Sequence, residues 1–134
     1  MIDISALTNS AGYLLEGVLV TLLLVALSLF IGFVCGIVLT MGQVYGPKVV
    51  KKLVGVYVWF FRGLPNIVLL FLFYFALFPF MGLDVPAFFV AVTVLGMRSA
   101  AYQSQIFRGA IESIASGQML AARSLGLTKW QAIR

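Results

Sequence analysis

The sequence contains little charge. Of its 134 residues, 10% are Asp, Glu, Lys or Arg, whereas soluble domains average about 25%. Hydrophobic residues make up 63%, which leaves too little polar surface to cover a water-soluble globule. Aromatic residues reach 14%, and this content together with the low charge argues against disorder. The composition therefore predicts a chain that is surrounded largely by lipid.

Histidine is absent, cysteine occurs once and acidic residues are few. The lack of histidine excludes a Ser–His–Asp triad and a zinc site built on imidazole. The single Cys35 lies in an apolar run and has no partner for an internal disulfide. The net charge is +5, but the cations are spread along the chain. We therefore expect no catalytic residue, no metal site and no nucleic-acid partner.

The long uncharged stretches predict an all-α membrane protein with three transmembrane helices. Residues 17–42 carry no charge and reach ~39 Å as a helix, enough to cross a ~30 Å hydrocarbon core. Turn-forming residues separate this run from two further apolar stretches. The predicted spans are 14–42, 64–82 and 86–107, followed by short helices in the segment 108–134.

The placement of the charges predicts the orientation. The segment before the first span holds Asp3 and Glu16 but no Lys or Arg, whereas the loop 43–52 holds three lysines. The next turn carries only Asp84, and the tail 108–134 is basic. Under the positive-inside rule, the N-terminus lies outside and the tail lies in the cytoplasm.

Small residues recur at every fourth position of the first span, at Ser28, Gly32, Gly36 and Thr40. They share one helix face, and small side chains allow another helix to approach closely. Dimerisation through this face is one interpretation. We favour packing against the second or third span of the same chain, because such a pattern alone is a weak dimerisation signal.

Arg62, Gly63 and Pro65 interrupt the apolar stretch 53–82. Because Pro65 has no N–H and its ring clashes with the preceding turn, a helix is expected to kink or break there. We place residues 53–61 near the inner interface and Arg62 at or near the headgroups. An interface anchor followed by a helix-entry turn is the plain interpretation of this motif.

Arg98 lies inside the third predicted span, ten residues before Arg108. That separation is ~15 Å along a helix and puts Arg98 near the middle of the hydrocarbon core. An arginine there costs at least about 2.5–3.5 kcal/mol, so it needs a partner or a water-filled cavity. Tyr102 and Gln105 follow on the same face. This polar stripe predicts the lining of a hydrophilic path; a structural ion pair or snorkelling toward the inner surface is the alternative.

The tail predicts two short helices joined at a glycine. Residues 119–125 favour a helix that Gly126 can end in the left-handed conformation. Thr128 and Gln131 have the spacing of a capping box that opens another helix. Several residues are too apolar for a solvated tail and indicate a docking element: Leu120, Leu125, Leu127, Trp130 and Ile133.

Three patterns in order along the chain resemble the polar amino-acid uptake permeases of ABC importers. They are residues 61–65 (FRGLP) with 70–74 (LFLFY), residues 101–114, and residues 117–126 (GQMLAARSLG), which resemble the "EAA" loop. The resemblance implies that residues 1–134 are a single transmembrane permease domain, incomplete at the C-terminus, because family members have five spans.

The resemblance also implies a location and partners. It implies a multi-pass protein of the cell (inner or cytoplasmic) membrane that pairs with a second permease subunit, identical or related. Two ATP-binding cassette ATPase subunits and an extracytoplasmic solute-binding protein complete the importer. ATP is then bound and hydrolysed by the partners, so this chain is not an enzyme and holds no cofactor. Gly117, Ala121, Ala122 and Gly126 are implied to form the element that couples to the ATPase.

The sequence departs from the family pattern at two places. Leu120 stands where the family's loop begins with an acidic residue, so an ion pair or cap made by that acid is absent. The chain also ends at Arg134, within the expected second coupling helix. This end predicts a truncated permease that need not transport on its own.

Two other classes of protein remain open from the residues. One is a small ATP-independent channel or ion-coupled transporter, complete at this length, with Glu16 or Arg98 as its charged centre. The other is a membrane module whose tail recruits a cytoplasmic partner without transport. Copurification with an ATPase subunit favours the importer, whereas electrogenic flux through the purified chain without ATP would exclude it.

The predicted orientation can be tested by cysteine labelling. In a background without Cys35, a cysteine at position 84 is expected to react with a membrane-impermeant reagent added outside. A cysteine at position 51 is expected to react only from the inside, because the lysine loop stays in the cytoplasm. The reverse pattern would overturn the orientation.

Overall fold

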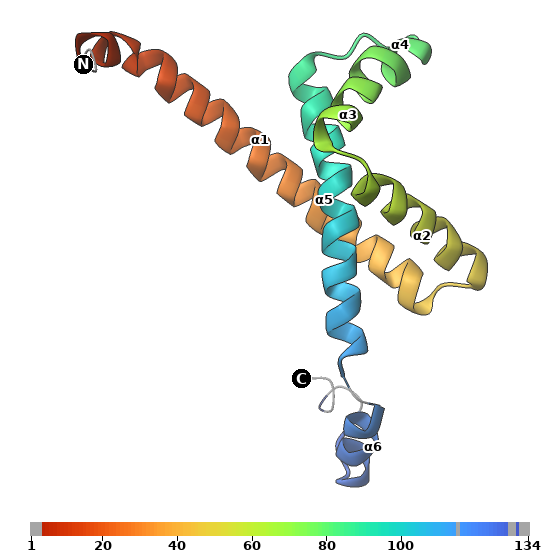
Figure 1. Ribbon diagram of the computed structural model, residues 1–134. Coiled ribbons are helices and arrows are strands. Elements are labelled where there is room, and N and C mark those ends of the chain that lie inside the picture. The colour runs from red at the N-terminus through yellow and green to blue at the C-terminus, as the bar shows by residue number, and fades with distance from the viewer. Residues whose placement is uncertain (1–3, 115, 129–130, 132–134) are drawn as a thin grey trace.

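A computed structural model describes residues 4–114, 116–128 and 131, and every regular element in this part of the chain is a helix (Figure 1). The all-α prediction is thereby confirmed. The elements in order are α1 (Ile4–Tyr45), α2 (Lys48–Gly63), α3 (Asn66–Phe71), the π-helix η1 (Leu72–Leu77), α4 (Phe78–Phe80), α5 (Ala87–Glu112) and α6 (Ser116–Ser124).

One helix within the described residues is by itself long and apolar enough to cross a membrane, residues 11–45 of α1. Helix α2 and the helical run 66–80 count as a second span if the bent pair is taken as one. Helix α5 covers the third predicted span, but Arg98 and the polar residues that follow make it less apolar. The three spans and their orientation therefore remain predictions.

Helices α1 and α5 cross and form the largest contact in the structure, as Figure 1 shows. The four small residues of α1 are all buried. A Cβ atom added at Gly32 would collide with Ser99, and one added at Gly96 of α5 would lie 2.9 Å from Cγ2 of Ile31. Glycine on each helix thus lets the other approach. The prediction that the small-residue face packs within the chain is confirmed.

Polar side chains also bridge the same crossing at several positions. Ser28 Oγ donates to the carbonyl of Val92 at 3.4 Å, and Thr40 Oγ1 donates to the carbonyl of Ser104 at 3.1 Å. Between them, Gln103 of α5 donates to the carbonyl of Leu29 at 3.3 Å. These bonds fix how α1 and α5 are aligned along their length.

The predicted break at Pro65 is confirmed. Helix α2 ends at Gly63, and Leu64 and Pro65 have extended backbone conformations. The helical run 66–80 leaves α2 at an angle of 109°. A buried apolar cluster fills the space between α2, the run 66–80 and α5: Val54, Val58, Phe61, Leu69, Phe73, Val90, Val94 and Ala101.

A second proline, Pro79, lies near the end of the run 66–80. Its effect on the helix before it was not predicted from the sequence. Pro79 has no N–H to donate to Phe75, four residues earlier, and its ring crowds the turn before it. The preceding residues widen into the π-helix η1, in which the N–H of Phe78 reaches the carbonyl of Phe73. A π-turn is a known way for a helix to relieve such a local conflict.

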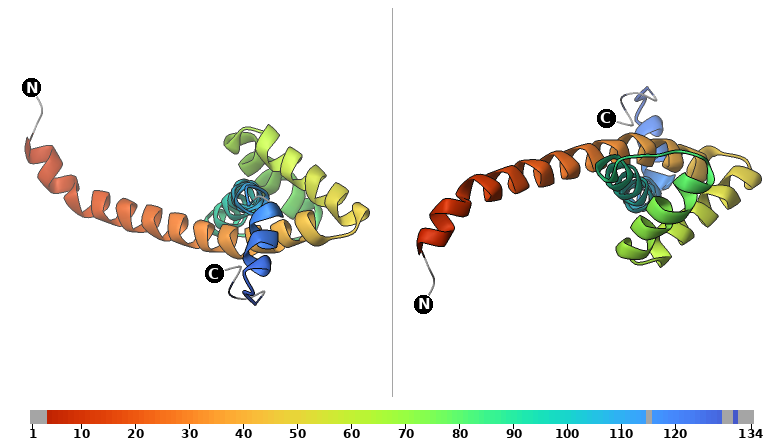
Figure 2. Two further views of the ribbon diagram at one scale, coloured as in Figure 1. Left: turned by 90° about the horizontal axis from the view of Figure 1, so that it is seen from below. Right: turned by 90° about the horizontal axis from the view of Figure 1, so that it is seen from above.

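The first part of α1 extends away from the other helices, as both views in Figure 2 show. Its large apolar side chains are exposed, and those of Tyr13, Leu15 and Leu19 each leave more than half of their surface uncovered. This section has the uniform apolar surface that a lipid-facing or partner-facing helix requires.

The close approach of α1 and α5 can be tested with two glycines of α1. Gly32→Val is expected to destabilise the protein by about 1–3 kcal/mol, because overpacking forces the helices apart. Gly17→Val is the matched control, since a Cβ there meets nothing within 4 Å. Thermal unfolding of the two variants in detergent measures the difference, and equal midpoints would contradict the packing role of Gly32.

Candidate functional site

The candidate site lies where α5 passes the end of α2. Arg98 of α5 donates hydrogen bonds from Nη1 to the carbonyl of Phe61, at 2.9 Å, and to the carbonyl of Leu64. Its Nη2 donates to Tyr102 Oη at 3.3 Å, one helical turn further on. The predicted pair Arg98 and Tyr102 thus lies together, beside the broken end of α2.

Arg62, in the last turn of α2, joins this pair. The ring centroid of Tyr102 lies 4.9 Å from Cζ of Arg62 and 5.3 Å from Cζ of Arg98. Such distances allow cation–π attraction from both guanidinium groups. One ring therefore contacts both arginines, and their guanidinium groups lie close together. The depth of each arginine in the membrane stays a prediction. Sequence reasoning missed this pairing, since the two residues are far apart in the chain.

No carboxylate within the described part of the chain pairs with this arginine cluster, which we define as Arg62, Arg98 and Tyr102. The one ion pair described joins Arg108 to Glu112 at 2.8 Å, further along α5. Guanidinium groups that have no carboxylate partner in an apolar chain favour an anion or water nearby. The cluster is therefore suited to attract a carboxylate or phosphate group.

A shallow recess opens beside the cluster and is lined by Val58, Trp59, Arg62, Gly63 and Tyr102. It combines an aromatic wall with a cation, which suits a small polar ligand with an anionic group. The segment 53–61, which the sequence places near the inner interface, contains Trp59, whose side chain is largely exposed. Tyr57 of the same segment is half-buried, and its hydroxyl donates to the carbonyl of Met97 at 2.7 Å.

Gln105, the third residue of the predicted stripe, faces a different neighbour. Its Nε2 donates to Oε1 of Gln43 on α1 at 2.8 Å. Gln43 is buried, although the sequence pattern assigned it to a turn. The polar stripe of α5 therefore divides between the end of α2 and the end of α1.

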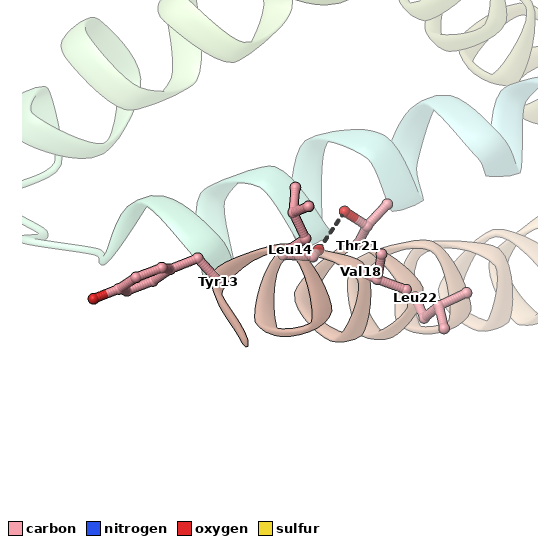
Figure 3. Close-up of a pocket in the computed structure, with 6 residues that line it drawn as sticks. Tyr13, Leu14, Val18, Thr21 and Leu22 are labelled. Carbon is pink, nitrogen blue, oxygen red and sulfur yellow. Dashed lines mark hydrogen bonds between the residues drawn. The ribbon is translucent and has the colours of Figure 1, made fainter. Parts of the chain in front are cut away.

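A depression on α1, shown in Figure 3, does not have the features of a ligand site. Its lining residues, among them Tyr13, Val18 and Leu22, all come from this one helix. The hydroxyl of Thr21 in its lining is already bonded to the carbonyl of Gly17 at 2.8 Å. No second element of the described chain closes it.

The predicted coupling residues lie in and after α6, which covers 116–124 where the sequence predicted 119–125. Gly126 ends this helix with φ +81°, as expected. The N–H of Leu127 bonds to the carbonyl of Ala122 at 3.2 Å, and the N–H of Gly126 bonds to that of Arg123 at 3.0 Å. This pair of bonds is a Schellman motif. Gly117 and Ala121 are exposed on the same helix, and Ala122 is half-buried.

The capping box after this turn is confirmed. The N–H of Thr128 donates to Oε1 of Gln131 at 2.9 Å, and the N–H of Gln131 approaches Thr128 Oγ1 at 3.4 Å. Leu125 is 81% exposed and Leu127 is 41% exposed, so both can reach a partner surface. Trp130 and Ile133, the side chain of Leu120 and the end at Arg134 lie outside the described residues.

Comparisons with known proteins agree on one group. A family profile described as "Binding-protein-dependent transport system inner membrane component" matches residues 28–134. The probable amino-acid ABC transporter permease YckA of Bacillus subtilis is 37% identical over 126 residues, which cover 94% of this chain and 55% of YckA. The glutamine transport system permease GlnP of Escherichia coli K12 is 34% identical over 133 residues, covering 98% of this chain and 61% of GlnP.

The fold has a solved counterpart. A crystal structure described as an amino acid ABC transporter with histidines matches the whole chain with a TM-score of 0.86 and 31% sequence identity. The match covers 62% of that structure's chain. The present chain thus spans little more than half the length of the curated relatives described above.

Proposed function

The chain belongs to the family of binding-protein-dependent transport system inner membrane components, and from this premise we propose that it is part of the permease subunit of an ATP-driven importer for polar amino acids. The observation that carries the proposal is the match over 94% or more of the chain to amino-acid permeases such as YckA and GlnP. The proposed location is the cytoplasmic membrane, which the protein crosses several times.

The proposed partners follow from this assignment. A second permease subunit completes the path, two ATP-binding cassette ATPase subunits supply the energy, and an extracytoplasmic solute-binding protein delivers the substrate. ATP is bound by the ATPase partners, so this chain contributes no catalytic residue. The connection between α4 and α5 lies toward one end of the molecule, and α6 lies at the other (Figure 1). This separation is compatible with a solute-binding protein at the first end and the ATPase subunits at α6.

Arg98, Tyr102 and Gln105 are proposed to line the translocation path, and we add Arg62 to this proposed set because it contacts the ring of Tyr102. The support is the uncompensated positive charge of the arginine cluster beside an open recess. A zwitterionic amino acid carries a carboxylate that a guanidinium binds by charge-assisted hydrogen bonds. Gln105 lies one to two turns further along α5, where a polar amide can accept or donate as the substrate moves on.

Gly117, Ala121, Ala122 and Gly126 are proposed to form the coupling element that docks the ATPase. Helix α6 is short, and the turn after it exposes Leu125 and Leu127. The two hydrogen bonds of the Schellman motif hold that turn in one conformation. A movement of α6 would therefore move the turn with it. A rigid turn with exposed apolar residues suits a contact that transmits movement.

The path assignment predicts a loss of uptake when the cluster loses charge. Arg62→Ala and Arg98→Ala are each expected to lower amino-acid uptake by roughly ten- to a hundredfold, because a charge-assisted hydrogen bond contributes about 1.5–3 kcal/mol. Uptake by the full-length protein with its partners, in vesicles with and without ATP, measures this. Arg108→Ala is the matched control, since Arg108 pairs with Glu112 away from the cluster. Full uptake by both variants at wild-type membrane levels would refute the path, and ATP-independent uptake would refute the importer.

The coupling assignment predicts a separation of ATP hydrolysis from uptake. Gly126→Val is expected to reduce uptake while hydrolysis continues, because a β-branched residue is strained at φ +81°. Gly126→Asn is the control, since asparagine adopts this conformation more readily. The ratio of ATP hydrolysed to substrate taken up is the measurement, and an unchanged ratio in the valine variant would count against the docking role.

A further inference from the structure

The break between α2 and α3 leaves carbonyl groups without helical partners. In an uninterrupted helix, the carbonyl of Phe61 accepts a hydrogen bond from the N–H four residues later. That residue is Pro65, which has no N–H. The carbonyl of Leu64 also loses its helical partner, because the chain turns through 109° before α3 begins. Both carbonyls therefore need donors from elsewhere.

Arg98 supplies donors to both of these carbonyls. Its Nη1 carries two hydrogens, and the structure directs them to the carbonyls of Phe61 and Leu64. A guanidinium presents its donors in a fixed planar fork, which suits two acceptors held side by side. Its positive charge is also favourable at the C-terminal end of a helix, where the peptide dipoles leave partial negative charge.

The residue next to Arg98 makes a second connection to α2. The carbonyl of Met97 accepts a hydrogen bond from Tyr57, which lies one turn before Phe61 in α2. Val94 and Ala101, about one turn to either side of Arg98, are fully buried in the apolar cluster. Helix α5 therefore holds the end of α2 by polar contacts at two consecutive residues, within packing that leaves little freedom.

From this geometry we propose that Arg98 is a positioning residue that replaces the hydrogen bond Pro65 cannot donate and thereby fixes the direction of the run 66–80 relative to α2. This role goes beyond the proposed transport function and does not depend on it. Arg98 also holds the end of α2 where Arg62 meets Tyr102, so the geometry of the cluster depends on the same bonds.

The angle at the break can be measured by spin labels on its two arms. In the full-length protein in a lipid bilayer, with Cys35 replaced by serine, cysteines at positions 52 and 80 carry the labels, because both native side chains are exposed. The labelled protein that keeps Arg98 is expected to give a narrow distribution of distances between the two labels. Arg98→Gln is expected to broaden or shift it, whereas Arg108→Gln leaves it unchanged. If the labelled Arg98→Gln variant gives the same distance distribution as the labelled protein that keeps Arg98, the proposal is overturned.

A substitution at Pro65 separates this role from a general loss of stability. Pro65→Ala restores an N–H that can reach the carbonyl of Phe61, so Arg98→Gln is expected to lower the thermal unfolding midpoint less in that background than in the native one. If Arg98→Gln lowers the unfolding midpoint equally with Pro65 and with Pro65→Ala, Arg98 does not replace the hydrogen bond that Pro65 cannot donate. Should Arg98→Gln fail to reach the membrane, Arg98→Lys takes its place in both measurements, because it keeps the charge but loses the fork. Neither readout uses uptake, so a failed transport assay leaves this test intact.

Discussion

A polar group in so apolar a chain must find its hydrogen-bonding partner within the protein, and this constraint organises the structure. No buried side-chain nitrogen or oxygen among the described residues lacks a partner. Ser28 and Thr40 of α1 reach backbone carbonyls of α5, and Arg98 of α5 reaches backbone carbonyls at the end of α2. An unpaired amide or hydroxyl in such surroundings costs several kcal/mol, so each pairing fixes how two helices meet.

Helix α5 is the element on which these contacts converge. Its small residues face α1, and its apolar residues share a cluster with α2 and the run 66–80. Arg98 donates to the carbonyl of Phe61, where α2 ends before that run. The parts of the chain that α5 does not contact are different in character. The first section of α1 and the turn after α6 both present exposed apolar side chains. Under the proposed function, we expect these surfaces to face lipid or partner subunits.

Local features of the structure were predictable because they depend on neighbouring residues. The break at Pro65, the left-handed Gly126 and the pairing of Thr128 with Gln131 each follow from the chemistry of one or two residues. The packing of the small-residue face was also predictable, since a stripe of Gly, Ser and Thr lets another helix approach closely. Whether that helix belongs to the same chain was a choice between two interpretations. The π-helix before Pro79 was not predicted, because the response of a helix to proline depends on what surrounds it.

The sequence by itself determined that the chain is helical and largely apolar, where its helices break, and which residues are polar enough to need a partner. Only the tertiary structure decided which partner each of them takes. Arg98 and Gln105 share a helix face, yet one meets the end of α2 and the other meets Gln43 of α1. Arg62 meets the ring of Tyr102, forty positions away in the chain. The physical reason is that hydrogen bonding and cation–π contact require groups to be a few ångströms apart, and the crossing of helices sets those distances.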